Sequence, residues 1–125
     1  MIIRTGKEVR FLDEMDRQRY LAHDPEFSRI IRYWLFDAMP DSRTRPNHRV
    51  LDGGIAPMDW PGWFTCAPPL GEGCRCTLVG ITGRRREALL GTGHYFDLTA
   101  GIPEGAGLDP GYVRPAHSIY NDPVR

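Results

Sequence analysis

Four residues in the middle of the sequence carry side chains that bind zinc well. They are one histidine and three cysteines, namely His48, Cys66, Cys74 and Cys76. Zinc favours tetrahedral sites built from imidazole nitrogen and thiolate sulfur. Only one residue separates Cys74 from Cys76, unlike the two-residue spacer of zinc knuckles, but in an extended strand this spacing turns both thiols to the same side. These residue types therefore make all four residues candidate ligands of a structural Zn²⁺ site.

Two other interpretations of these residues stay open. Free cysteines are among the most buried residue types, and His48 would then be a hydrogen-bonded loop residue. The second interpretation is a disulfide between Cys66 and one of the other two cysteines. Three cysteines cannot all pair within one chain, and a reducing cytoplasm disfavours the bond, so we expect reduced thiols.

Two aspartates near His48 in the sequence raise the question of catalysis. Asp52 or Asp59 beside the imidazole would be the minimum for general acid–base chemistry or metal-assisted hydrolysis, as in a nuclease or a toxin-like enzyme. However, the run Leu-Asp-Gly-Gly is typical of a turn in which Asp52 accepts from backbone amides two residues on. A zinc ion with four protein ligands also leaves no position open for water. We therefore predict a protein that is not an enzyme.

The segment that must position these side chains is rich in turn-forming residues. The 125 residues include 14 glycines and 11 prolines, well above the usual combined share of roughly 12%. They are densest over residues 39–83, where long helices cannot fit and only residues 76–82 have the pattern of a strand. Such a segment needs an anchor other than regular secondary structure, and a metal ion is a common one.

Helices are predicted on the N-terminal side of this segment. Apolar residues near helical spacing predict a helix over residues 7–22, ended by the run His23-Asp24-Pro25. Asp24 would then cap a second helix that has Pro25 at its first position. We expect the apolar face of this second helix to comprise Phe27, Ile30, Ile31, Trp34 and Leu35.

The C-terminal part is predicted to hold one short helix and a tail. The helix covers residues 84–90 and is closed by Gly91, and an extended Pro/Gly-rich tail runs over a surface. The length fits one domain. We predict a small, loop-rich α+β fold with an N-terminal helical segment (1–38), a zinc-stapled core with short strands (39–100) and the tail (101–125).

The charge balance argues against a nucleic-acid binder. Lys+Arg and Asp+Glu both number 16, so the net charge is zero, and residues 84–86 are most simply a solvated helix face. Four arginines lie near the predicted ligands, and we favour internal pairing with acidic neighbours over contacts to phosphate. These are Arg43, Arg45, Arg49 and Arg75, with Asp37, Asp41, Asp52 and Glu72 as the acidic candidates.

Hydropathy also limits the class of protein. Hydrophobic residues make up 41% of the chain, which is enough for a packed core, and we expect Trp63 to lie in that core. No run of about 18 apolar residues exists, so no membrane span is expected. Residues 1–4 lack the long apolar stretch of a signal peptide, so we expect synthesis in a cytoplasm.

The block that contains the predicted ligands resembles the phage Mu F-like head morphogenesis proteins. That family carries a segment Asp-Ser-Arg-Thr-Arg-x-x-His-x-x-Leu-Asp-Gly, then a Trp, a Pro-Pro pair and a closing Cys-Arg-Cys. The family often has His where this chain has Cys66, and the two residue types share little except zinc binding. The resemblance covers residues 33–81, and residues 107–112 are more loosely similar to a downstream element. The matching positions are 41–45, His48, 51–53, Trp63, Pro68, Pro69 and 74–76.

The resemblance implies a minor structural protein of a tailed-phage virion. It would act in head morphogenesis, and in DNA packaging or ejection, at the portal vertex or in the capsid interior. Its expected partners are the portal protein, the major capsid protein or both, with packaged DNA as an additional candidate. Several copies docked on a ring of subunits would compensate for weak single contacts.

Overall fold

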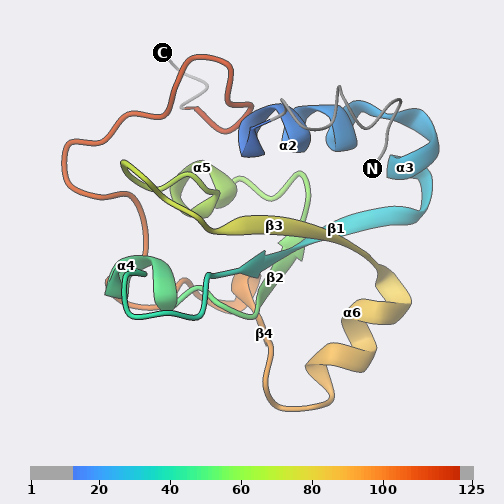
Figure 1. The fold of residues 1–125 in the computed structure, drawn as a ribbon. Coiled ribbons are helices and arrows are strands. Elements are labelled where there is room, and N and C mark those ends of the chain that lie inside the picture. Colours follow the sequence, from blue (N-terminus) through green and yellow to red (C-terminus); the bar gives the residue numbers. More distant parts are fainter. Residues whose placement is uncertain (1–12, 122–125) are drawn as a thin grey trace.

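A computed structural model describes residues 13–121, and these form a small mixed sheet with helices on both sides (Figure 1). The fold class is therefore α+β, as predicted. Within the described residues, no helix is long and apolar enough to cross a membrane. The elements in chain order are α2 (Glu14–His23), α3 (Pro25–Ile30), β1 (Ile31–Asp37), α4 (Pro46–Arg49), β2 (Gly54–Pro57), α5 (Trp63–Cys66), β3 (Thr77–Thr82), α6 (Gly83–Leu90), β4 (Phe96–Asp97) and the 3-10 helix η1 (Leu98–Ala100).

Strand β1 lies inside the sheet, whose order is β3-β1-β2-β4. It pairs antiparallel with both neighbours, so that Leu35 lies opposite Ile55 on one side and Val79 on the other. Strand β4 adds a short parallel edge to β2. The sheet thus joins chain segments from the N-terminal third, the turn-rich centre and the region after α6.

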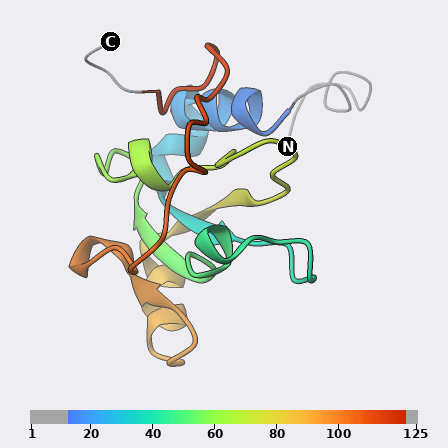
Figure 2. The ribbon, with the colours of Figure 1, turned by 90° about the vertical axis from the view of Figure 1, so that its left-hand side faces the viewer.

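The two faces of the sheet bury two separate apolar clusters. Trp34 and Phe36 of β1 point into the larger cluster, where both are fully buried together with Trp63, as predicted for that tryptophan. The intervening Tyr33 and Leu35 contact the smaller cluster beneath α6. Figures 1 and 2 show α2 and α3 on one side of the sheet and α6 on the other. Alternate residues of one strand therefore face two covered sides.

The predicted second helix is wrong beyond Ile30. Residues 31–37 form β1 instead of continuing α3, so Ile31, Trp34 and Leu35 are strand residues and not part of a helical face. The run is almost continuously apolar, and it is β-branched or aromatic at most positions. A strand buried on both faces has this composition and lacks a clear two-residue alternation, which makes it resemble a helix by periodicity alone.

Other local predictions are confirmed. Asp24 accepts hydrogen bonds from the amides of Glu26 and Phe27, and Pro25 is the first residue of α3. The first helix is present as α2, although the predicted residues 7–12 lie outside the described residues. Strand β3 and helix α6 match the predicted segments, but Gly91 ends α6 with a φ of −70° and not in the left-handed region.

The centre and the C-terminal segment contain little regular structure, as expected from their glycines and prolines. Between β1 and β3 the elements α4, β2 and α5 are each 4 residues long. The C-terminal segment (residues 101–121) has no helix or strand among its described residues. It nevertheless buries Arg114, Ser118 and Tyr120 against the rest of the chain. Its position is therefore set by contacts within the same molecule.

Candidate metal centre

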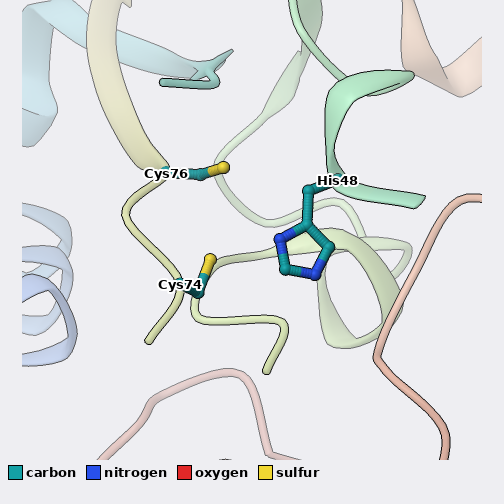
Figure 3. Close-up of side chains that lie close together, drawn as sticks. All are labelled: His48, Cys74 and Cys76. Carbon is teal, nitrogen blue, oxygen red and sulfur yellow. The ribbon is translucent and has the colours of Figure 1, made fainter. Parts of the chain in front are cut away.

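His48, Cys74 and Cys76 come together beside the start of β3. The ligand atoms of these three side chains all lie within 4.8 Å of one another. His48 is held by the single turn of α4, which begins at Pro46, and is 2% exposed. Figure 3 shows the two sulfur atoms and one ring nitrogen turned toward a common point. Two thiols and an imidazole are the donor set that zinc favours, so these residues fit the predicted ion.

Cys66 does not belong to this group, among the residues that the structure describes. It ends α5 and is fully buried in the larger apolar cluster. Burial raises the pKa of its thiol to about 11, which disfavours the thiolate form. The sequence prediction of Cys66 as the fourth ligand remains a prediction, and the structure brings together the other three members of the set.

The two clustered thiols are coupled by a hydrogen bond. The Cys76 thiol donates to the sulfur of Cys74, which lowers the pKa of Cys74 to about 5. The same bond, together with burial, raises the pKa of Cys76. One thiolate is therefore stabilised before any metal arrives, and thiolate is the form that binds metal. Within the described residues all three cysteines are free, so the predicted disulfide alternative is not formed.

An aspartate from the C-terminal segment contacts the other side of the imidazole. Asp109 Oδ1 lies 2.9 Å from Nε2 of His48, and Oδ2 accepts a hydrogen bond from Arg45 at 2.8 Å. Partial burial raises the pKa of Asp109, but bonds from Asn47 and His48 and the charge of Arg45 outweigh it, so the pKa lies below its usual value. An ionised carboxylate can only accept, so Nε2 carries the proton of this hydrogen bond, and in the neutral form of the ring the free lone pair is then on Nδ1.

The arginines near the cluster make internal contacts. Arg75, between the two cysteines, donates two hydrogen bonds to the carboxylate of Asp41 at 2.9 and 2.7 Å. Arg45 also donates to the carbonyl of Glu72, in the loop that leads to Cys74. The predicted pairing of Arg75 is therefore confirmed, whereas the partner of Arg45 is Asp109 and was not foreseen. Both contacts brace the loop that carries the thiols.

The two aspartates of the catalytic alternative do not pair with His48. Asp52 accepts a hydrogen bond from the amide of Ala38 at 2.9 Å, so it binds backbone, but the predicted bond to the amide two residues on is wrong. Asp59 is exposed in the segment after β2. Within the described residues, neither carboxylate is hydrogen-bonded to the imidazole, whose Nε2 is occupied by Asp109.

Comparison with known proteins identifies the family to which this arrangement belongs. The model of the Phage Mu protein F like family matches residues 13–79, more than half of the chain. The chain belongs to the Phage Mu protein F like family. The match spans α2 to the first half of β3 and includes all four predicted ligands, which confirms the resemblance found in the sequence. No solved structure is significantly similar to this chain.

Three relatives of this Mu F-like chain share parts of the same region. The Mu-like prophage FluMu F protein of Haemophilus influenzae is 44% identical over 50 residues, 40% of this chain and 12% of the relative. The "Putative capsid assembly protein F" of Escherichia phage Mu is 37% identical over 57 residues, 46% of this chain and 13% of the relative. An uncharacterized protein of Methanocaldococcus jannaschii is 35% identical over 79 residues, 59% of this chain and 11% of the relative. The matched region is thus a small part of each relative.

Asp109 is the residue that sequence reasoning missed. It lies 61 positions from His48 and beyond the residues that the family model matches. The only signal was the run 107–112, which is loosely similar to a downstream element of the family. Spacing rules work within one helix or strand, so they could not connect an aspartate in a loop to a histidine so far away in sequence.

Proposed function

We propose that this Mu F-like chain is a structural component of a tailed-phage head. It acts in head morphogenesis by docking onto the portal protein or the major capsid protein, in several copies, and is not an enzyme. The observation that carries the proposal is the family match over residues 13–79, together with the phage Mu relative named for capsid assembly. The geometry supports a structural role, because the imidazole of the candidate centre is enclosed by thiols and a carboxylate.

The proposal includes a zinc ion bound by His48, Cys74 and Cys76. The ion would hold together α4 and the loop before β3, two segments with only short regular structure. A folded metal site of this kind contributes its binding free energy to folding, because the unfolded chain does not present the ligands together. The zinc would thereby keep these two segments in one conformation.

The docking proposal is tested by co-expressing the tagged chain with the portal and major capsid proteins encoded in the same genome. We expect the chain to co-purify with one of them, and to be incorporated into assembled heads. The capture is repeated after nuclease treatment, so that a bridge made by DNA is separated from direct protein contact. Heads that assemble normally and contain no trace of the chain would contradict the proposal.

The enzyme alternative needs its own measurement. Purified chain is incubated with DNA and RNA in the presence of Zn²⁺, Mg²⁺ or Mn²⁺, beside the variants His48→Ala and Asp59→Asn. We expect no cleavage above the background of a mock purification. Cleavage that disappears in His48→Ala but persists in a variant of an exposed residue such as Arg85→Lys would favour the nuclease.

A further inference from the structure

The carboxylate of Asp109 connects the C-terminal segment to both parts of the candidate metal centre. Oδ1 accepts from Asn47 at 2.8 Å and bonds His48 Nε2 at 2.9 Å, and Oδ2 accepts from Arg45 at 2.8 Å. The amide of Asp109 donates to the carbonyl of Leu70 at 2.7 Å, in the loop that leads to Cys74. Asp109 of the C-terminal segment is therefore hydrogen-bonded both to α4 and to the loop that leads to Cys74.

This contact sets the form of the imidazole. With the proton of Nε2 directed at the carboxylate, the free lone pair is on Nδ1, and Figure 3 shows this nitrogen facing the sulfurs of Cys74 and Cys76. A carboxylate that accepts a proton from a metal-binding imidazole fixes the ring and increases the basicity of the ligating nitrogen. Asp109 therefore prepares His48 to bind a metal through Nδ1.

We propose that Asp109 is a positioning residue for the metal centre, and that metal binding and docking of the C-terminal segment stabilise each other. This inference rests on the zinc proposed above. Coupling between two binding events is reciprocal, so a segment that improves zinc affinity by a given factor is itself held more firmly by that factor when zinc is bound. Bound zinc thus stabilises the docked position of a segment that lies beyond the residues matched by the family model.

The packing around Asp109 provides a second way to disturb it. A Cβ added at Gly71 would lie 1.8 Å from Asp109 Oδ2 and 3.2 Å from its Cβ, and no other side chain is among its nearest contacts. Gly71 does not have a positive φ, so alanine meets no backbone strain there. Gly71→Ala should therefore displace the carboxylate without removing its charge.

The test is a competition titration of Zn²⁺ against a chromogenic chelator, with the full chain and its variants. We expect Asp109→Asn and Gly71→Ala to weaken zinc binding by about 10- to 100-fold, the usual effect of removing such a partner. Asp97→Asn is the matched control, because Asp97 also pairs with an arginine but caps η1, outside the cluster. It should leave the zinc affinity unchanged.

Hydrogen–deuterium exchange provides a readout that a purely structural role would not move. In the wild type, zinc should slow exchange over residues 107–121, and the slowing should be lost in both Asp109→Asn and Gly71→Ala. The coupling is overturned if both folded variants bind zinc with wild-type affinity. It is also overturned if zinc does not change the exchange rate of residues 107–121 in the wild type. Either outcome leaves the zinc site itself standing. If the reduced wild-type chain binds no zinc, the metal centre is overturned and the coupling with it, whereas the head-assembly proposal is judged by its own capture experiment.

Discussion

The single residue between Cys74 and Cys76 places two thiols on the same side of the chain as it enters β3. A strand directs residues two apart to one face, so this spacing makes a chelating pair without a helical turn or a zinc knuckle. The third donor, His48, comes from a four-residue helix 26 positions earlier and must be oriented by its neighbours. The site is therefore built from short segments whose positions depend on one another.

The proposed metal centre predicts that Cys74 and Cys76 are both required for zinc binding. Freshly purified, reduced wild-type chain should contain one zinc per molecule by elemental analysis, and Cys74→Ser or Cys76→Ser should abolish it. Because the binding free energy is part of the folding free energy, a chelator should lower the thermal unfolding midpoint of the wild type but not that of these variants. A chain free of metal, with a midpoint that chelator leaves unchanged, would contradict the site.

Cobalt substitution tests whether the metal has the four ligands predicted from the sequence or only the three that the structure brings together. Sulfur-to-cobalt charge-transfer absorption reports the number of bound thiolates. If Cys66 completes the set, Cys66→Ser lowers this absorption by the share of one thiolate, whereas Cys76→Ser, which should abolish metal binding, gives the baseline without bound thiolates. Unchanged absorption in a folded Cys66→Ser variant would leave the site with two thiolates.

The types of the ligands could be predicted from the sequence, but not which of them meet. His48, Cys74 and Cys76 were predicted because few other residues bind zinc, and the structure clusters them. Nothing in the sequence distinguishes Cys66, whose place in the larger apolar cluster depends on how α5 packs. Asp109 has the same difficulty, because its role arises from a contact between two distant loops.

At the scale of elements, the sequence predicts helix boundaries better than it separates a helix from a buried strand. The Asp24-Pro25 pair fixes the start of α3 through local hydrogen bonds, which the residue types in the sequence predict. The identity of β1 depends instead on pairing with β2 and β3, whose paired residues come 20 or more positions later. Long-range pairing decided the conformation where local periodicity was ambiguous.

Helix α2 covers the outer edge of β3 with side chains. Glu14 accepts from the amide of Leu78 at 2.9 Å, and Arg17 donates to the carbonyl of the same residue. Edge strands with unpaired backbone groups are prone to join other chains, so these contacts protect the edge. Burial of Glu14 is the main reason that the pKa of its carboxyl lies above the ordinary 4.5.

This raised pKa predicts a pH-dependent stability. The folded state favours protonated Glu14, so its contribution is present below the ordinary pKa and is lost as the pH rises through the raised value. The variant Glu14→Gln should therefore gain stability relative to wild type between pH 4 and pH 7. Urea unfolding at several pH values measures the difference, with Glu26→Gln on α3 as the exposed control. A difference that is constant across this range would contradict the prediction.

A buried arginine fixes the C-terminal segment to α5. Arg114 is 5% exposed and donates to the carbonyls of Phe64, Ala67 and Tyr120 at 2.6 to 3.0 Å. Burial lowers its pKa to about 10, which still leaves it charged at neutral pH. The planar guanidinium reaches several acceptors at once, and the positive charge also lies at the C-terminal end of α5.

Arg114→Lys should therefore destabilise the protein strongly. An ammonium group cannot reach all of these carbonyls, and hydrogen bonds that involve a charged group contribute about 1.5–3 kcal/mol each, so we expect a loss of about 2 kcal/mol or more in the free energy of unfolding. Urea denaturation provides the measurement. The same change at exposed Arg85 of α6 is the control and should stay within about 0.5 kcal/mol of wild type.

At the scale of the whole molecule, the C-terminal segment belongs to the core although the family match ends before it. Tyr120 accepts a hydrogen bond from the indole of Trp34 at 2.7 Å and donates to the carbonyl of Met58 at 3.0 Å. Trp34 is fully buried in β1, inside the sheet. The segment thus reaches the central strand through Tyr120, the α5 helix through Arg114 and the candidate metal centre through Asp109.

The last prediction follows from these three contacts. A fragment of residues 1–100 should lose the cooperative unfolding transition. It should also show red-shifted tryptophan emission, because Trp34 becomes exposed to solvent. A synthetic peptide of residues 101–121 should restore the transition in trans, and zinc should tighten its binding, since Asp109 supports the metal ligand. A peptide carrying Arg114→Lys should bind more weakly and serves as the control. If the fragment alone unfolds at the wild-type midpoint, the segment is only a surface appendage and the metal centre stands without it.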